Sequence, residues 1–199
     1  LTTKDEVPDP NKLRVRIDKR CVHVEIGRFA AIEREASAAV TLVMSVIATD
    51  TMDIAVRRAV ELGVARIEPV LAARSQASAR GERAARRVAH WRQIVQAACE
   101  QCGRNRVPAV AEIVPITERI AAAGEQDVML VPGARMALAR RVNDSAPNAL
   151  IVGPEGGFTD AELSLAERQH VSQAQLGPRM LRAETAAIAA LAIVTALAG

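Results

Sequence analysis

Apolar positions follow two different periods along the chain from residue 40 onward. Short continuous apolar runs, typical of buried strands, alternate with segments in which apolar residues recur every three or four positions, typical of helices. The runs predict strands over residues 40–47, 64–70, 107–114, 127–131, 148–152 and 171–176. The helical segments run from Asp50 or Thr51 to Gly63, along a longer stretch ending near Gly103, and over residues 117–123, 134–142, 159–169 and 183–197. This alternation predicts an α/β fold with a mainly parallel sheet.

Residues 1–39 have a different pattern. Residues 1–11 are polar and proline-rich, whereas residues 13–17 and 21–26 alternate apolar with polar positions, which is the period of half-buried strands. Two such strands do not make a stable domain alone. The change of pattern near residue 39 nevertheless predicts two domains, residues 1–39 and residues 40–199, of which the first needs further strands. The alternative for the first segment is a β-hairpin packed on the main domain.

A glycine-rich stretch, Gly153-Pro154-Glu155-Gly156-Gly157, follows the strand predicted at residues 148–152. It leads into Thr159, with Glu162 three residues later, which is a helix-capping signal. Glycines let a ligand approach the main chain closely, and open α/β sheets bind small molecules at the carboxyl ends of their strands. A phosphate-binding loop would carry a lysine, but no lysine follows Lys19. The stretch therefore predicts a site for a neutral or cationic ligand. A tight turn with Glu155 in solvent is the alternative.

A second stretch, residues 176–186 with the sequence LGPRMLRAETA, also opens a predicted helix. Together the two stretches resemble the RsmE family of 16S ribosomal RNA uridine-N3 methyltransferases, of the SPOUT superfamily. That family has a Gly-Pro-Glu-Gly-Gly loop and a Leu-Gly-x-x-x-Leu-Arg-x-Glu-Thr-Ala segment. Residues 61–64 (ELGV), and residues 100–104 (EQCGR) with Val107 and Pro108, also match. The resemblance covers the chain from about Met44 to the end.

The resemblance implies a C-terminal trefoil knot that binds S-adenosyl-L-methionine. It also implies an N-terminal PUA-like β-barrel that helps to hold RNA, of which residues 1–39 contain only a part. The implied cofactor-binding residues lie in three loops and are Val131, Pro132, Gly133, Gly153, Pro154, Glu155, Gly156, Gly157, Leu176, Gly177, Met180 and Leu181. For Glu155 we favour a role in holding its loop by bonding the loop amides. Opposing the positive charge of the cofactor is the alternative.

The implied reaction is methylation of N3 of a uridine, at position 1498 of 16S rRNA in its usual numbering. This nitrogen bears a proton, so catalysis needs a proton acceptor and a donor that stabilises negative charge on the uracil oxygens. Arg182 is the candidate donor, because it is always charged and lies beside the implied cofactor loop. Glu184 is the candidate acceptor. Its place in the first turn of the last helix also suits a structural role, because the helix dipole stabilises a carboxylate there.

Basic residues are concentrated in the middle of a chain whose net charge is only +3. Eleven arginines and four glutamates lie between Arg57 and Arg106, which indicates a polyanionic partner. We expect that partner to be 16S rRNA or the small ribosomal subunit. The candidate RNA-binding residues are Arg57, Arg58, Gln101 and Arg104, and helix-end capping is the alternative for the last two. The family usually has a lysine before ELGV, where this chain has only Arg57 and Arg58.

Three histidines and three cysteines are spread along the chain. His23, His90 and His170 are scattered and predict no metal site, and Cys21, Cys99 and Cys102 are too few for a disulfide framework. The C-x-x-C pair falls near the end of a predicted helix, whereas redox pairs favour helix starts. We expect structural cysteines. The sequence has no signal peptide and no apolar stretch of about 20 residues, so we expect a soluble, cytoplasmic protein without membrane contact.

The last predicted helix, residues 183–197, is apolar nearly all round. A helix without a polar face is buried on every side, which predicts a homodimer through the knot region and this helix, with Leu191 and Val194 in the interface. Enclosure of the helix within one subunit is the alternative. A methyltransferase is thus the leading hypothesis, and a non-catalytic RNA-binding module is the second. A nucleotide-phosphate enzyme is disfavoured by the missing lysine.

Overall fold

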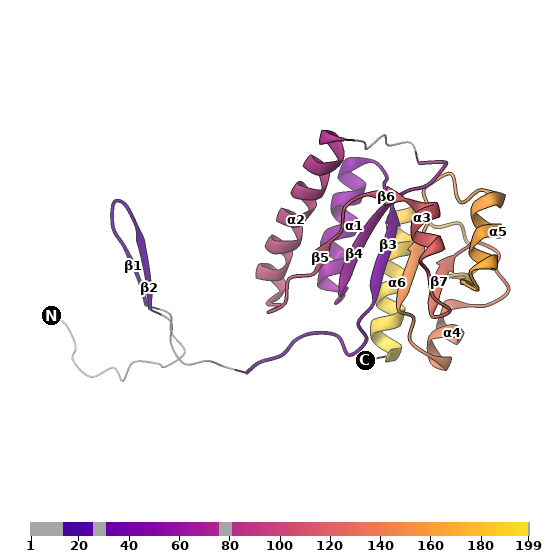
Figure 1. Cartoon of the computed structure of the whole chain (residues 1–199). Coiled ribbons are helices and arrows are strands. Elements are labelled where there is room, and N and C mark those ends of the chain that lie inside the picture. The colour runs from indigo at the N-terminus through magenta and orange to yellow at the C-terminus, as the bar shows by residue number, and fades with distance from the viewer. Residues whose placement is uncertain (1–13, 26–30, 76–80, 199) are drawn as a thin grey trace. The chain divides into compact units, whose positions relative to one another are not determined.

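The computed structural model describes residues 14–25, 31–75 and 81–198, and the chain divides into two compact units. The first unit is residues 1–33, and the second is residues 34–199 (Figure 1). The second unit therefore begins at Arg34, six residues before the start that the sequence pattern predicts. Residues 34–36 belong to it because Glu35 pairs with Arg104, and because Ala36 lies against Gly63.

The described part of the first unit forms a β-hairpin. Strands β1 (Arg14–Ile17) and β2 (Val22–Glu25) are antiparallel, with Ile17 opposite Val22. The two predicted strands are therefore present. They are not half-buried, because their apolar side chains are all at least 50% exposed: Val15, Ile17, Val22 and Val24. The remaining residues predicted to form a barrel lie largely outside the described residues, so the barrel stays a prediction.

The second unit contains a parallel sheet with the strand order β5-β4-β3-β8-β7-β9, in which β6 also pairs with β4. The strands are β3 (Thr41–Ser45), β4 (Arg66–Leu71), β5 (Ala109–Val110), β6 (Val114–Pro115), β7 (Asp127–Leu130), β8 (Ala149–Val152) and β9 (Ser172–Ala174). All pairings in this sheet are parallel, as predicted. The single strand predicted at residues 107–114 is wrong. One residue more separates Val110 from Val114 than separates their partners on β4, so the pairing breaks into two short strands.

Helices cover the two faces of this sheet, and in the described residues they are α1 (Thr49–Glu61), α2 (Glu82–Cys102), α3 (Ile116–Ala121), α4 (Leu138–Asp144), α5 (Asp160–Arg168) and α6 (Ala183–Ala198). Helices α1, α2, α4 and α6 pack into one core cluster with the side chains of Leu42, Met44 and Leu150. Alternate residues of the same strands, Val43 and Ile151, face the second cluster with α3 and α5. The result is a three-layer arrangement around the sheet (Figure 1).

The helix ends agree with the sequence prediction at some positions and differ from it at others. Thr159 caps α5 in a capping box with Glu162, and Gly103 ends α2 in the left-handed conformation with a φ of 74°, both as predicted. The cap predicted for α1 at Asp50 or Thr51 is wrong, because Ala48 precedes the first turn and provides no side-chain bond. Helix α4 begins at Leu138 instead of residue 134, since Ala137 is bridged to Gln175 in an extended conformation.

Helix α6 packs against α1, α4 and β8. Leu191 and Val194, which the sequence places in a dimer interface, are each 1% exposed and belong to the core of one subunit. That placement is wrong, because an all-apolar helix gives no period from which its inward face can be read. The outward positions of α6 are Thr185, Ile188, Ala189, Ala192 and Ala196. Among the described residues, no helix has the length and apolar character to cross a bilayer.

Arg104 is a structural residue and not an RNA contact. Its side chain is only 5% exposed. One terminal nitrogen donates to the carbonyl oxygens of Val60 (3.0 Å) and Val64 (2.9 Å), and Nε donates to Glu35 (3.1 Å), which the other terminal nitrogen also contacts. Arg104 therefore joins the end of α1, the start of β4 and the segment before β3. Its predicted role in RNA binding is wrong, since its donors all face inward.

We predict that Arg104→Ala lowers the free energy of unfolding by about 3 kcal/mol. Removing one member of a buried ion pair leaves the other in place without its partner, and the two carbonyl groups also lose their donor. Urea denaturation followed by circular dichroism measures the change. Arg57→Ala is the control, because Arg57 is exposed on α1, and we expect it to change stability by less than about 0.5 kcal/mol. Equal effects of the two substitutions would contradict the structural role.

Candidate functional site

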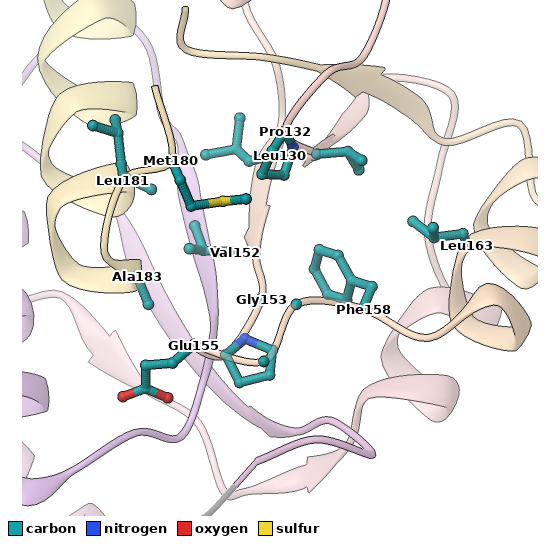
Figure 2. A pocket seen from close by; sticks show the side chains of 15 residues that line it. Leu130, Pro132, Val152, Gly153, Glu155, Phe158, Leu163, Met180, Leu181 and Ala183 are labelled. Atoms are coloured by element: carbon teal, nitrogen blue, oxygen red, sulfur yellow. The ribbon is translucent and has the colours of Figure 1, made fainter. Parts of the chain in front are cut away.

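Three segments meet at the carboxyl ends of β7 and β8, which are neighbouring parallel strands. They enclose a cavity of about 320 Å³, and a cavity of about 40 Å³ adjoins it through shared residues. The segments are the residues after β7, the glycine loop after β8, and residues 176–186 at the start of α6. Figure 2 shows side chains from all three around the larger cavity. The larger cavity is lined by Leu130, Val131, Pro132, Val152, Gly153, Pro154, Glu155, Gly156, Gly157, Phe158, Leu163, Met180, Leu181, Ala183 and Ala186.

Most residues that the resemblance assigns to a cofactor lie around these two cavities. Nine line the larger cavity: Val131, Pro132, Gly153, Pro154, Glu155, Gly156, Gly157, Met180 and Leu181. Leu176 and Gly177 line only the smaller one. Gly133 lines neither cavity and has a φ of 78°, so its role in the structure is to turn the chain after β7.

Sequence reasoning missed the apolar residues that complete the wall: Leu130, Val152, Phe158, Leu163, Ala183 and Ala186. Leu130 and Val152 are the last residues of β7 and β8, so their position beside the loops follows from the strand ends. Phe158 directly follows the glycines and is one of only two phenylalanines in the chain. An aromatic residue next to a glycine-rich loop, in a chain with so few aromatic residues, indicates a cavity wall. These side chains make the wall mostly apolar, with main-chain groups of the glycine loop as its polar part.

Two of the loop glycines are required for identifiable reasons. Gly157 has a φ of 68°, which other residues rarely adopt, and its amide donates to the carbonyl of Pro154 at 2.9 Å. A Cβ atom on Gly153 would lie 3.1 Å from the ring of Phe158. Glycine at position 153 thus allows the ring to pack on the main chain, as Figure 2 shows. The loop is compact because of both features.

Arg74, which no sequence motif indicated, holds the glycine loop from outside. It follows β4, and its guanidinium donates to the carbonyl oxygens of Gly156 (3.0 Å) and Phe158 (3.1 Å). The neighbouring amide of Ala73 donates to the buried carboxylate of Glu162 at 2.8 Å. The other oxygen of Glu162 accepts from the amide (2.7 Å) and hydroxyl (2.9 Å) of Thr159. The loop after β4 is therefore joined to the segment after β8 by the side chain of Arg74 from one and the side chain of Glu162 from the other.

Glu155 does not have the loop-holding role that we favoured from the sequence. Its side chain is exposed, and it makes no hydrogen bond or ion pair with any residue that the structure describes. In Figure 2 its carboxylate points away from Phe158 and Met180. Arg74, and not Glu155, supplies the side-chain bonds that hold the loop.

The two candidate catalytic residues lie where the third segment enters α6. Arg182 is exposed and stands between Leu181 and Ala183, which both line the larger cavity. Glu184 is half-buried in the first turn of α6. Within the described part of the chain, neither side chain has a hydrogen-bond or ion-pair partner. Both are therefore available to a molecule at the margin of the cavity.

The candidate RNA-binding residues do not gather at the cavity. Gln101 is exposed at the end of α2, and Arg104 contacts the carbonyl of Val64 just before β4, so both lie toward the amino end of the parallel sheet. The cavity lies at the carboxyl end. Arg57 is exposed on α1, and Arg58 pairs with Glu61 at 2.6 Å.

Other arginines do lie at the carboxyl end. Arg87, in the second turn of α2, donates to the carbonyl of Ile47 and the hydroxyl of Thr49, both at 3.2 Å, just after β3 ends. The first turns of α2 also carry Arg83 and Arg86, which are exposed. The start of α2, and not its end, therefore places basic side chains at the same end of the sheet as the cavity.

Comparison with known proteins identifies the class. The family described as RNA methyltransferase domain matches residues 34–195, which is most of the chain. The chain therefore belongs to this family. Its relatives include ribosomal RNA small subunit methyltransferase E of Mesomycoplasma hyopneumoniae (strain 232), 31% identical over 150 residues that cover 75% of this chain and 66% of the relative. The protein of that name from Bacillus subtilis (strain 168) is 28% identical over 156 residues, covering 73% and 61%. These relatives confirm the resemblance to the RsmE family. The chain spans less than two thirds of their length.

Solved structures agree with this assignment. The crystal structure of a ribosomal RNA small subunit methyltransferase E from Neisseria gonorrhoeae bound to S-adenosyl methionine matches with a TM-score of 0.85 and 34% identity, over 93% of this chain and 77% of that one. The Legionella pneumophila protein Lpg2936 in complex with the cofactor SAM matches with a TM-score of 0.83 and 33% identity, over 92% and 78%. The parallel α/β unit is thus similar to SPOUT methyltransferase structures.

Proposed function

We propose that this chain is an S-adenosylmethionine-dependent RNA methyltransferase that methylates N3 of a uridine in 16S rRNA. The observation that carries the proposal is the cavity at the carboxyl ends of β7 and β8, enclosed by the three loops that the family motifs mark. The similarity of the chain to the cofactor-bound Neisseria gonorrhoeae structure supports the same conclusion. The acceptor position rests on the RsmE resemblance.

The residues around the cavity suit S-adenosylmethionine. A volume of about 320 Å³ is enough for a small ligand. The apolar wall formed by Leu130, Val152 and Leu181 suits a flat adenine, and the glycine loop offers main-chain donors and acceptors for its polar edge. The wall contains no lysine or arginine to oppose a sulfonium cation. We attribute the meeting of the three loops to the trefoil knot of the SPOUT fold.

Arg182 and Glu184 have distinct roles in this proposal. S-adenosylmethionine, held by the glycine loop and by Met180 and Leu181, would supply the methyl group to N3 of the uridine. The N3 proton would first have to pass to an acceptor. Arg182 stabilises negative charge on the uracil oxygens, because it is exposed and flanked by cavity residues. Glu184, in the first turn of α6, is the candidate proton acceptor.

The RNA partner is proposed from the distribution of charge. Arg83, Arg86 and Arg87 at the start of α2 lie at the cavity end of the sheet, where a nucleotide entering the site would bring its backbone phosphates. Arg57 and Gln101 remain as more distant candidates. We further propose that residues 1–39 belong to a PUA-like barrel that holds RNA. A substrate in the small ribosomal subunit would place the enzyme in the cytoplasm.

We also propose a homodimer through the outward stripe of α6. Ile188, Ala189 and Ala192 are apolar and only half-buried within one subunit, and neither hydrophobic core includes them. Small side chains allow two helices to approach closely, and a two-fold axis would pair the stripe with itself. Because the stripe begins one residue after Glu184, such a dimer would lie close to both active sites.

Isothermal titration calorimetry with S-adenosylmethionine tests the cofactor site. We predict that the wild-type chain binds and that Arg74→Ala binds up to about thirtyfold more weakly, because two hydrogen bonds to the glycine loop, each contributing about 1 kcal/mol, are lost. Arg83→Ala is the matched control, because Arg83 makes no bond to that loop, and its affinity is expected to equal that of the wild type. A folded wild-type chain that fails to bind would favour the non-catalytic RNA-binding module. Unchanged affinity of Arg74→Ala would remove only the role given to Arg74.

For Arg182→Ala we predict a loss of about 10²–10³ in the single-turnover rate of methyl transfer to small-subunit RNA. The affinity for S-adenosylmethionine should change little, because the partner of Arg182 is charge that develops on the uracil. Arg182→Lys keeps a positive charge without the planar fork and should retain part of the rate. If the alanine variant transferred methyl groups normally, or lost only cofactor affinity, Arg182 would not be the stabilising group.

For assembly, we predict that the wild-type chain is a dimer and that Ala192→Glu is a monomer with the same secondary structure. A buried carboxylate without a partner is strongly disfavoured at an apolar interface. Light scattering with size-exclusion chromatography measures the mass. Ala97→Glu is the control, because Ala97 is exposed on α2, and this variant should remain a dimer. A monomeric wild type at micromolar concentration would exclude the proposed interface.

A further inference from the structure

Three potential metal ligands converge on the hairpin of the first unit. Asp18 and Cys21 lie in the turn between β1 and β2, and His23 lies on β2. Their ligand atoms all lie within 4.8 Å of one another, and they form one such group among the residues that the structure describes. We propose that this hairpin binds a divalent metal ion of the zinc class through Asp18, Cys21 and His23. The proposal is independent of the methyltransferase function.

The spacing of the three ligand atoms suits a tetrahedral ion. The Sγ atom of Cys21 lies 3.2 Å from Oδ2 of Asp18 and 3.0 Å from Nε2 of His23, and Nε2 lies 3.6 Å from Oδ2. Tetrahedral zinc with ordinary bond lengths holds sulfur, nitrogen and oxygen ligands about 3.4–3.6 Å apart. Shifts of up to about half an ångström would therefore admit the ion. Exposed side chains can make such shifts, and all three are exposed.

The turn holds the ligands near these positions through the main chain. Oδ1 of Asp18 accepts from the amides of Arg20 (2.8 Å) and Cys21 (3.0 Å), which leaves Oδ2 for the ion. The amide of Asp18 donates to the carbonyl of Cys21 at 3.0 Å and closes the turn. His23 lies two residues after Cys21, and the strand period of two puts both side chains on the same face.

The chemistry of the three ligands favours zinc over magnesium or calcium. A thiolate and an imidazole are ligands for zinc and similar transition metals, whereas hard cations prefer oxygen alone. Positive charge nearby opposes any cation, because Arg16 lies opposite His23 and because Lys19 and Arg20 are in the turn. A carboxylate and a thiolate supply two negative charges against it. The exposed side of the group leaves a fourth position for water.

Metal binding would have a structural consequence for the hairpin. An isolated two-stranded hairpin is marginally stable in water, and the apolar side chains of this one are exposed. An ion that joins the turn to β2 would favour the folded hairpin by its binding free energy. The hairpin of β1 and β2 would then be more stable with metal than without it.

The chain contains its own control in the C-x-x-C pair of α2. Cys99 is buried, and its Sγ faces the carbonyl of Arg106 at 3.8 Å, whereas Cys102 faces the carbonyl of Cys99 at 3.9 Å. Neither belongs to a group of three potential ligands in the described residues. Substitution of Cys21, or of Cys99 and Cys102 together, can therefore show which of these cysteines gives a thiol-dependent metal signal.

The test is titration of the reduced full chain with Co²⁺ under anaerobic conditions. We expect one equivalent to give thiolate-to-cobalt and tetrahedral ligand-field absorption, and one equivalent of Zn²⁺ to remove both. Cys21→Ser should abolish the thiolate band, and His23→Ala and Asp18→Asn should weaken binding at least tenfold. The double variant Cys99→Ser, Cys102→Ser should behave as the wild type, with circular dichroism confirming that all variants are folded. A band that survives Cys21→Ser, that requires Cys99 and Cys102, or that does not saturate at one equivalent would overturn the proposal.

Discussion

The buried carboxylate of Glu162 is the group on which the geometry of the cavity depends. It is 3% exposed, and its two oxygens accept from the amide and hydroxyl of Thr159 and from the amide of Ala73. A buried carboxylate without such donors would cost several kilocalories per mole, so the loops that supply them are held in place. This one side chain therefore fixes both the start of α5 and the loop after β4. The glycine loop, which lies between β8 and α5, is fixed at its exit as a result.

The cavity combines a rigid wall with an open margin. The wall is rigid because β7 and β8 are paired strands, and because Arg74 holds the carbonyl groups of Gly156 and Phe158. The margin is the segment before α6, where Met180 is 79% exposed and Arg182 is also exposed. Parallel pairing brings the loops after β7 and β8 to one edge of the sheet, which is where α/β folds bind ligands. The arrangement suits an enzyme that encloses a cofactor and meets a macromolecule at the open side.

The sequence predicts those features whose cause lies within a few neighbouring residues. It does not predict contacts between residues that are far apart in the sequence. The capping box of Thr159 and Glu162 spans three residues, and the left-handed end of α2 needs only Gly103, so both were predictable. The bond from Arg74 to Gly156 joins residues 82 positions apart, and no pattern near either residue announces it. Arg104 matched a family motif, but its burial against Val60, Val64 and Glu35 is visible only in three dimensions.

Two further features of the structure differ from the sequence prediction for other reasons. The inward side of α6 could not be assigned because apolar residues on every face remove the period that orients a helix. Leu191 and Ala192 are both apolar in sequence, yet one is core and the other faces outward. The group of Asp18, Cys21 and His23, by contrast, is local and could have been found. Its three side chains lie within six residues of sequence, so their convergence needs only the turn between β1 and β2.

The distribution of arginine charge explains why a count of basic residues predicts a polyanionic partner but does not locate the contacts with it. Within residues 57–106, several arginines are paired with carboxylates, namely Arg58 with Glu61, Arg66 with Glu68, Arg92 with Glu112 and Arg104 with Glu35. Glu35 lies before β3 and Glu61 lies at the end of α1, so these two pairs are at the amino end of the sheet. At the start of α2, Arg86 pairs with Glu82 at 3.7 Å, and both side chains stay largely exposed. Arg83 and Arg86 are exposed at the start of α2, at the carboxyl end of the sheet, where the proposed RNA substrate would approach Arg182.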